Sequence, residues 1–96
     1  MYILVTYDVD TSTKDGERRL RRVAKACVDY GQRVQNSVFE CDVTEVQFCL
    51  LKDRLSQIID SSLDSIRIYH LNKSENRRTE VLGLETAYNV NDAMII

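Results

Sequence analysis

Asp8 is the residue most suggestive of chemistry, because it ends an apolar run, YILVTY, at residues 2–7. A carboxylate at the end of a buried strand suits a hard divalent cation, since Mg²⁺ needs oxygen ligands and keeps several of its waters. Asp10 would project on the same side if the strand continued. Both aspartates also suit a turn, in which they would accept backbone hydrogen bonds. The sequence leaves the metal role and the turn role open.

A single carboxylate is a poor metal site, but a two-fold axis near the end of this strand would bring two copies of Asp8 together. A cation held by the pair would activate water for attack on a phosphodiester and neutralise charge on the phosphate oxygens. The chemistry expected of a dimer is therefore phosphodiester hydrolysis with Mg²⁺, or with Mn²⁺ in its place.

A basic patch follows Asp8, although the whole protein has a net charge of −2. Residues 1–35 hold seven cations and five anions, whereas residues 36–96 hold six and ten, which gives +2 and −4. Guanidinium groups bind phosphates through forked hydrogen bonds. A solvated helix face explains the patch equally well. The candidate nucleic-acid-binding residues are Arg18, Arg19, Arg22 and Arg33.

Other reactive side chains favour structural roles. The chain has no Ser-His-Asp order, no phosphate-binding glycine loop and no dinucleotide motif, so we expect neither nucleophilic catalysis nor a nucleotide cofactor. Ser37 and Phe39 flank a turn, and Phe39 suits the core better than a base-stacking surface. We expect His70 to be structural or at the surface, and the three cysteines, at 27, 41 and 49, to be reduced thiols of the core.

The composition is that of one globular domain that folds in water. The chain has 96 residues, of which 44% are hydrophobic and 29% charged. No apolar run approaches the roughly 18 residues of a membrane span. The first residues do not resemble a secretory signal, so we expect the protein to act in the cytoplasm.

A helix after the first strand must position the basic patch. Ser12 or Thr13 can cap its start, and Gly31 supplies a left-handed stop. Between these limits one apolar stripe recurs at helical spacing. The arginines flank this stripe, so we expect them to face solvent. The stripe consists of Leu20, Val23, Ala24, Cys27 and Val28.

Sequence patterns also predict a hairpin, a second helix and further strands. Alternating runs at 32–35 and 38–43 predict a hairpin. A capping box that starts at Thr44 predicts a helix that ends near residues 60–62. Strands are predicted at 65–71 and, more weakly, at 79–82 and 93–96.

This order, βαββαβ with a tail, predicts an α+β ferredoxin-like sandwich with both helices on one face of the sheet. We expect a single domain, 1–96, with a core at 1–84 and an apolar tail at 85–96 that adds to a sheet edge or to a partner. The first strand is apolar on both faces, so the uncovered face predicts a homodimer that packs sheet against sheet.

Three segments resemble the second numbered family of CRISPR-associated (Cas) proteins, the small dimeric nuclease-fold subunit of the spacer-acquisition machinery. They are VTYDV at 5–9, the arginine-rich RRLRRVAK at 18–25 and GQRVQNSVFEC at 31–41. The likeness covers the chain nearly end to end, and it is greatest to the branch found with compact class-one systems of the C subtype.

The resemblance implies a ferredoxin-like homodimer in which Asp8 pairs across the two-fold axis to bind Mg²⁺ or Mn²⁺. It implies an endonuclease that acts on single-stranded RNA or double-stranded DNA. By position, six residues match those that the family keeps near its site, and Asp10 is a weaker match. The six are Tyr7, Arg18, Arg19, Arg33, Ser37 and Phe39.

Two alternatives stay open. In the first, the dimer is a non-catalytic scaffold that holds a protospacer duplex between two dimers of the integrase, the first numbered Cas protein. In the second, the chain is a toxin-like ribonuclease of the virulence-associated D type, which has the same fold and no integrase partner.

Overall fold

The elements follow one another in the predicted order, and the weaker strand prediction at 79–82 is confirmed. The computed structural model describes residues 1–71 and 79–84. The predicted strand at 93–96 and the predicted tail at 85–96 lie outside the described residues. The elements are β1 (Tyr2–Asp8), α1 (Lys14–Tyr30), β2 (Gln32–Gln35), β3 (Val38–Asp42), α2 (Glu45–Ile58), β4 (Ser65–His70) and β5 (Thr79–Gly83).

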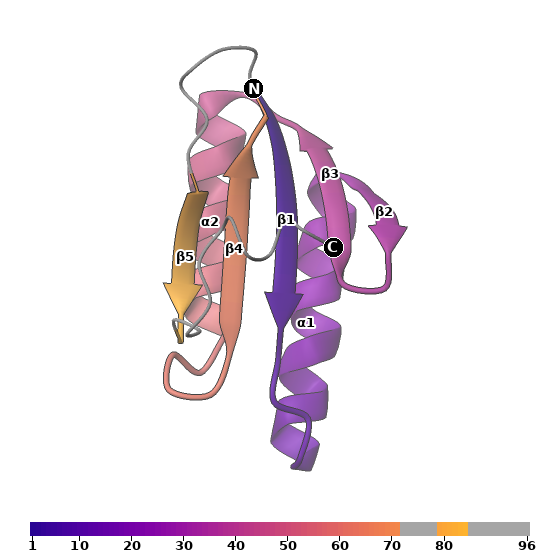
Figure 1. Cartoon of the computed structure of the whole chain (residues 1–96), viewed down its shortest axis with the longest axis vertical. Helices are drawn as coiled ribbons and strands as arrows, with labels where there is room; N and C mark the ends of the chain where they lie inside the picture. The colour runs from indigo at the N-terminus through magenta and orange to yellow at the C-terminus, as the bar shows by residue number, and fades with distance from the viewer. Residues whose placement is uncertain (72–78, 85–96) are drawn as a thin grey trace, which may run out of the picture.

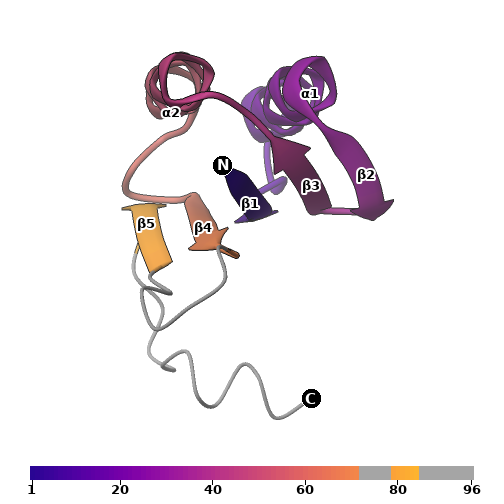
Figure 2. The same ribbon diagram turned by 90° about the horizontal axis from the view of Figure 1, so that it is seen from above.

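The five strands form one sheet in the order β2-β3-β1-β4-β5, and every neighbouring pair is antiparallel (Figure 1). Both helices lie on the same face of this sheet (Figure 2). The predicted α+β ferredoxin-like fold is therefore confirmed, and β5 extends the sheet beyond β4. The homodimer stays a prediction.

Side chains of the central strand β1 alternate between the two faces of the sheet. Ile3, Val5 and Tyr7 are buried in the core against the helices. The alternate positions, from Tyr2 to Asp8, are exposed or half-buried. Because successive side chains of a strand point to opposite faces, these positions lie on the face that the helices leave uncovered. We call it the outer face.

Helix α1 begins as predicted. The Thr13 side chain accepts a hydrogen bond of 3.1 Å from the Gly16 backbone N–H. The apolar stripe is shifted from the prediction, because Ala26 is fully buried whereas Val28 is 53% exposed. Val23 and Cys27 are buried as predicted.

The interpretation of Gly31 as a left-handed stop is wrong. Its φ is −160° and its ψ is −163°, an extended conformation that any residue adopts. Glycine is required here by space, because a Cβ would overlap the Glu40 carbonyl oxygen and the Cys41 thiol on β3. The first residue after α1 therefore lies directly against the sheet.

Helix α2 has the predicted capping box. Thr44 accepts a hydrogen bond from the Gln47 backbone, and the Gln47 side chain accepts one from the Thr44 backbone. The helix ends at Ile58, earlier than predicted. The reason is local, because Ile59 is extended and Asp60 accepts a hydrogen bond of 2.9 Å from the Ser62 backbone N–H, forming a turn instead.

Asp64, between α2 and β4, is fully buried and joins three segments. Its carboxylate accepts hydrogen bonds from Arg19 Nε at 2.8 Å and from the backbone N–H groups of Asp10 at 3.0 Å and Asp60 at 2.9 Å. Arg19 also donates to Asp15 at 2.6 Å. This arrangement, the Asp64 network, fixes the loop after β1 against α1 and against the loop before β4.

The cysteines carry free thiols, as predicted, and Cys27 and Cys41 are buried, but the prediction of a core position is wrong for Cys49, which is exposed. Burial raises the pKa of Cys27 to about 12 and that of Cys41 to about 11. Both thiols are therefore protonated and unreactive at neutral pH. Of the helices within the described residues, neither has the length and hydropathy to cross a bilayer.

Replacing Asp64 with alanine should lower the free energy of unfolding by about 3–5 kcal/mol, because the buried guanidinium of Arg19 loses its partner. Asp15→Ala is the matched control, since that side chain is 71% exposed and its i,i+4 pair contributes at most about 0.5 kcal/mol. Urea denaturation at fixed protein concentration measures both. Equal losses in the two variants would contradict the role assigned to Asp64.

Stability should also depend on Asp64 in acid. Burial opposes its ionisation, but hydrogen bonds from Arg19 and two backbone N–H groups outweigh burial and lower its pKa below the usual value. A lowered carboxyl pKa stabilises the fold above the unfolded pKa of about 3.9, and this contribution is lost as pH falls through the folded pKa. Wild type should therefore exceed Asp64→Asn in unfolding free energy by a constant amount above about pH 5 and by less below about pH 4. An unchanged difference at low pH would refute this.

Candidate functional site

Asp8 is the last residue of β1 and pairs with Ser65 of β4. Its side chain is exposed and lies on the outer face. Within the ranges that the structure describes, no hydrogen bond or ion pair engages its carboxylate. The carboxylate is therefore available to a ligand on the side of the sheet that carries no helix.

The Asp8 carboxylate fits a hard cation in donor type, because Mg²⁺ and Mn²⁺ prefer oxygen ligands. It does not make a metal site by itself. Over residues 1–71 and 79–84, no group of three or more His, Cys, Asp or Glu side chains could hold a metal ion. A site at Asp8 would need further ligands from water, from substrate or from a second copy of the chain.

Asp10 makes the hydrogen bond expected of a turn residue. Its carboxylate accepts a hydrogen bond of 2.9 Å from the Ser12 backbone N–H, and this bond lowers the pKa of Asp10. The strand has already ended at Asp8, so the condition for the two carboxylates to project together is not met. Asp10 shapes the loop that follows the candidate site.

Tyr7 lies beside Asp8 in the chain but points to the opposite face, where it is buried. Its hydroxyl donates a hydrogen bond of 3.2 Å to the Asn36 carbonyl, and its backbone N–H donates one of 3.1 Å to the Ser37 carbonyl. Burial raises the pKa of Tyr7 above the usual value. Tyr7 and Ser37 therefore fix the β2–β3 turn next to the end of β1.

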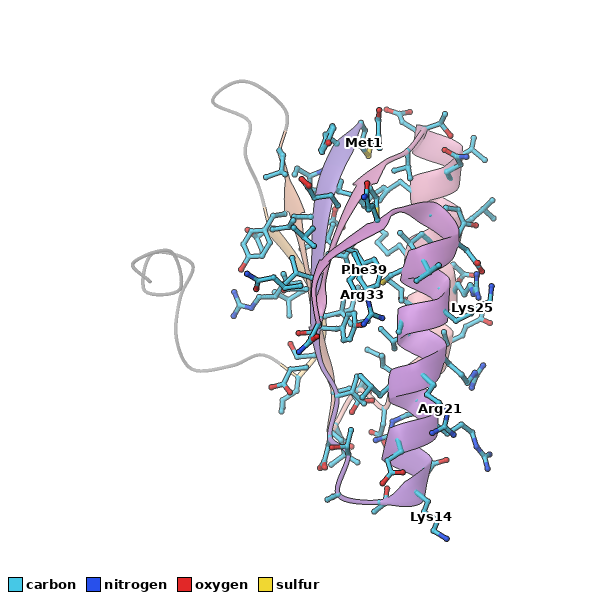
Figure 3. All side chains as sticks on the ribbon, turned by 90° about the vertical axis from the view of Figure 1, so that its right-hand side faces the viewer. Met1, Lys14, Arg21, Lys25, Arg33 and Phe39 are labelled. Atoms are coloured by element: carbon cyan, nitrogen blue, oxygen red, sulfur yellow. The ribbon has the colours of Figure 1, made fainter. Side chains whose placement is uncertain are left out.

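Phe39 is fully buried, as predicted, and its ring stacks on that of Tyr7 with centroids 6.1 Å apart. The guanidinium of Arg33 lies 5.1 Å from the centre of the Phe39 ring (Figure 3). Arg33 pairs with Phe39 in the sheet, so its side chain is on the helix side. The structure brings Tyr7, Phe39 and Arg33 together, but on the side away from the Asp8 carboxylate.

The expectation that every arginine of α1 faces solvent is wrong for Arg19. Arg19 is 7% exposed, because Asp64 accepts its hydrogen bonds in the core, and the same bonds raise its pKa. Its positive charge is paired with Asp15 and Asp64 of the same chain. Arg18 and Arg22 are exposed as predicted and line a groove between α1 and α2.

Sequence reasoning missed Arg67, a cation on the outer face near Asp8. Arg67 is 9% exposed and pairs with Thr6, two positions along β4 from the partner of Asp8. Such diagonal neighbours are about 7–8 Å apart. The signal was the alternation SIRI at 65–68, which sets residues 65 and 67 on one face once β4 is paired with β1.

Comparison with known proteins shows which family has this sequence and this fold. The family model described as "CRISPR associated protein Cas2" matches residues 1–79. The chain belongs to the Cas2 family. The resemblance found in the sequence is thereby confirmed.

Individual Cas2 proteins match over almost their whole length. The chain is 48% identical to the CRISPR-associated endoribonuclease Cas2 1 of Moorella thermoacetica over 96 residues, which is 100% of both chains. It is also 48% identical, over 95 residues and 99% of both chains, to the CRISPR-associated endonuclease Cas2 of Halalkalibacterium halodurans.

The fold agrees with a solved member of the family. The crystal structure of Streptococcus pyogenes Cas2 at pH 6.5 matches with a TM-score of 0.71 and 65% sequence identity. The match covers 77% of this chain and 89% of the Streptococcus chain.

Replacing Tyr7 with phenylalanine should cost about 0.5–1.5 kcal/mol in unfolding free energy, because the hydrogen bond to Asn36 is lost while the ring stays packed on Phe39. The same variant should increase amide hydrogen exchange in the β2–β3 turn. Tyr69→Phe, on the outer face, is the control. An unchanged exchange rate at the turn would contradict the positioning role of Tyr7.

Proposed function

We propose that this Cas2-family chain is a metal-dependent endonuclease that works as a homodimer, with Asp8 of each copy holding one Mg²⁺ or Mn²⁺ ion. The observation that carries the proposal is the exposed carboxylate of Asp8 at the end of the central strand, which has no partner in the part of the chain that the structure describes. The activity agrees with the names of its relatives, which are endoribonuclease or endonuclease.

The outer face supports the dimer. The helices leave this face uncovered, and it carries the apolar side chains of Tyr2, which is 46% exposed, and Leu4, which is half-buried. Apolar groups on an uncovered sheet face are typical of an interface between subunits. Packing two such faces about a two-fold axis near the end of β1 would place two Asp8 carboxylates at one ion.

The ion, when bound, would polarise the phosphate and lower the pKa of an attacking water. Asp8 would fix its position. Arg18 and Arg22 on α1 and Arg33 on β2 would hold the nucleic-acid backbone at a distance from the cleaved bond, since none of them lies on the outer face. Arg19 is left out of this set, because Asp64 already binds it.

We also propose a substrate and a partner, both inferred from the family. The substrate is double-stranded DNA or single-stranded RNA, and both are phosphodiesters. We place the protein in the cytoplasm, in the spacer-acquisition step of CRISPR immunity, with the integrase as its partner. As a scaffold, the same dimer would hold duplex DNA between two integrase dimers without cleaving it.

Asp8→Asn tests the endonuclease directly. Losing the carboxylate removes the metal's contribution of several kcal/mol to the transition state, so Mg²⁺-dependent cleavage should fall by about 10²-fold or more. The measurement follows cleavage of labelled single-stranded RNA and duplex DNA, with and without EDTA, and light scattering checks that the variant remains a dimer.

Asp53→Asn, an exposed carboxylate on α2, is the matched control and should cleave as wild type does. Cleavage that Asp8→Asn leaves undiminished would reject Asp8 as the metal ligand and favour the scaffold. A wild-type protein that is monomeric at micromolar concentration would reject the shared ion.

A further inference from the structure

A basic groove lies between the two helices on the solvent side of the helical layer. It has a cavity volume of about 280 Å³. Figure 3 shows two of its residues, Arg21 and Lys25, on the side of α1 that points away from the sheet. We call it the helix groove. Its lining residues are Arg18, Arg21, Arg22 and Lys25 of α1 with Arg54, Gln57 and Ile58 of α2.

The helix groove has far more positive than negative charge. Five of its lining residues are cations. One carboxylate, Asp29, faces them, and it binds Lys25 at 2.5 Å and Arg54 at 2.8 Å. These two hydrogen bonds lower the pKa of Asp29, so its negative charge is already paired with Lys25 and Arg54.

Three of the four arginines that line the helix groove, all of them on α1, have no such partner among the described residues. Among the described residues, Arg18, Arg21 and Arg22 form no ion pair. All three are exposed, so none of them packs in the core. Five cations against one carboxylate leave a net charge of about +4 on a protein whose total is −2.

Cations of α1 lie close enough along the helix groove to repel one another. Arg18 and Arg22, like Arg21 and Lys25, are spaced i,i+4, where like charges cost a few tenths of a kcal/mol per pair. Glu17 and Asp29, which are spaced i,i+4 from Arg21 and Lys25, offset only part of this repulsion. An anion in the groove would remove the repulsion, and this favours a ligand rather than a solvated face.

The spacing of the cations suits a row of phosphates. Lys25 follows Arg18 by seven positions, which is about 10 Å along the helix axis at roughly 1.5 Å per residue. One nucleic-acid strand carries a phosphate about every 3.4 Å along its axis, so this length matches about three of them. Guanidinium groups bind phosphate through paired hydrogen bonds.

The helix groove is separate from the Asp8 site. The groove is on the outside of the helical layer, whereas Asp8 is on the opposite face of the sheet. Phosphates bound in the groove therefore cannot contact Asp8 of the same chain. Arg21, Lys25 and Arg54 belong to this surface and have no role in the proposed cleavage.

We propose that the helix groove is a second anion site, which binds a run of about three phosphates from one nucleic-acid strand or from a free triphosphate. For the nucleic-acid source, the inference rests on the proposed function. For a free triphosphate it stands without it.

The test uses Arg21→Gln/Lys25→Gln on an Asp8→Asn background in EDTA, so cleavage does not enter the measurement. The probes are a fluorescent 10-nucleotide single strand and inorganic triphosphate. Two lost phosphate contacts should reduce the slope of log K against log salt by about 1.4 and weaken strand binding at least tenfold at 0.05 M salt. Lys14→Gln/Lys52→Gln, which removes the same charge outside the groove, should change both less than threefold.

The two probes distinguish the sources. Weakened strand binding without measurable triphosphate binding assigns the groove to nucleic acid. Weakened binding of triphosphate assigns it to free phosphate chains. If the groove variant binds both probes as its parent does, or if the control loses as much, the proposal is wrong. Cleavage that depends on Asp8 is measured in a separate experiment, so the helix-groove proposal and the proposed endonuclease function can each be rejected without the other.

Discussion

Alternation along β1 is the constraint on which the rest of the structure depends. Because both helices cover one face of the sheet, the odd-numbered residues of this strand form the core and Asp8 must face the other way. Tyr7 and Asp8 are adjacent in the chain, yet one fixes the β2–β3 turn and the other is free for a ligand. A shift of one residue in register would exchange these roles.

The end of β1 also depends on contacts from outside the sheet. The Asp64 network joins the loop after β1 to α1 and to the loop before β4, so the position of Asp8 is set from both sides. This explains why the basic segment of α1 contains arginines of two kinds. Arg19 is buried and pairs with Asp64, whereas its neighbours on the solvent side line the helix groove.

Local patterns predicted most of the fold, because caps, turns and strand alternation involve residues close together in sequence. Thr13, Thr44 and the turn at 36–37 are examples. Arg19 could not be assigned in this way, since its partner Asp64 is 45 residues away and nothing in their spacing links them. Gly31 was misread for a similar reason, because the contact that requires glycine is made with β3. Asp8 was found from its place in the strand, but its face could be assigned only once the helices were placed.

Strand β2 forms one edge of the sheet, and its register shifts between Arg33 and Gln35, so Val34 is an extra, unpaired residue. Exposed edges can template the growth of sheets from chain to chain, and a short strand with such a bulge is a poor template. The four residues of β2 are too few and too irregular to guide a regular ladder with another molecule. At high concentration this side of the protein should therefore resist fibril formation.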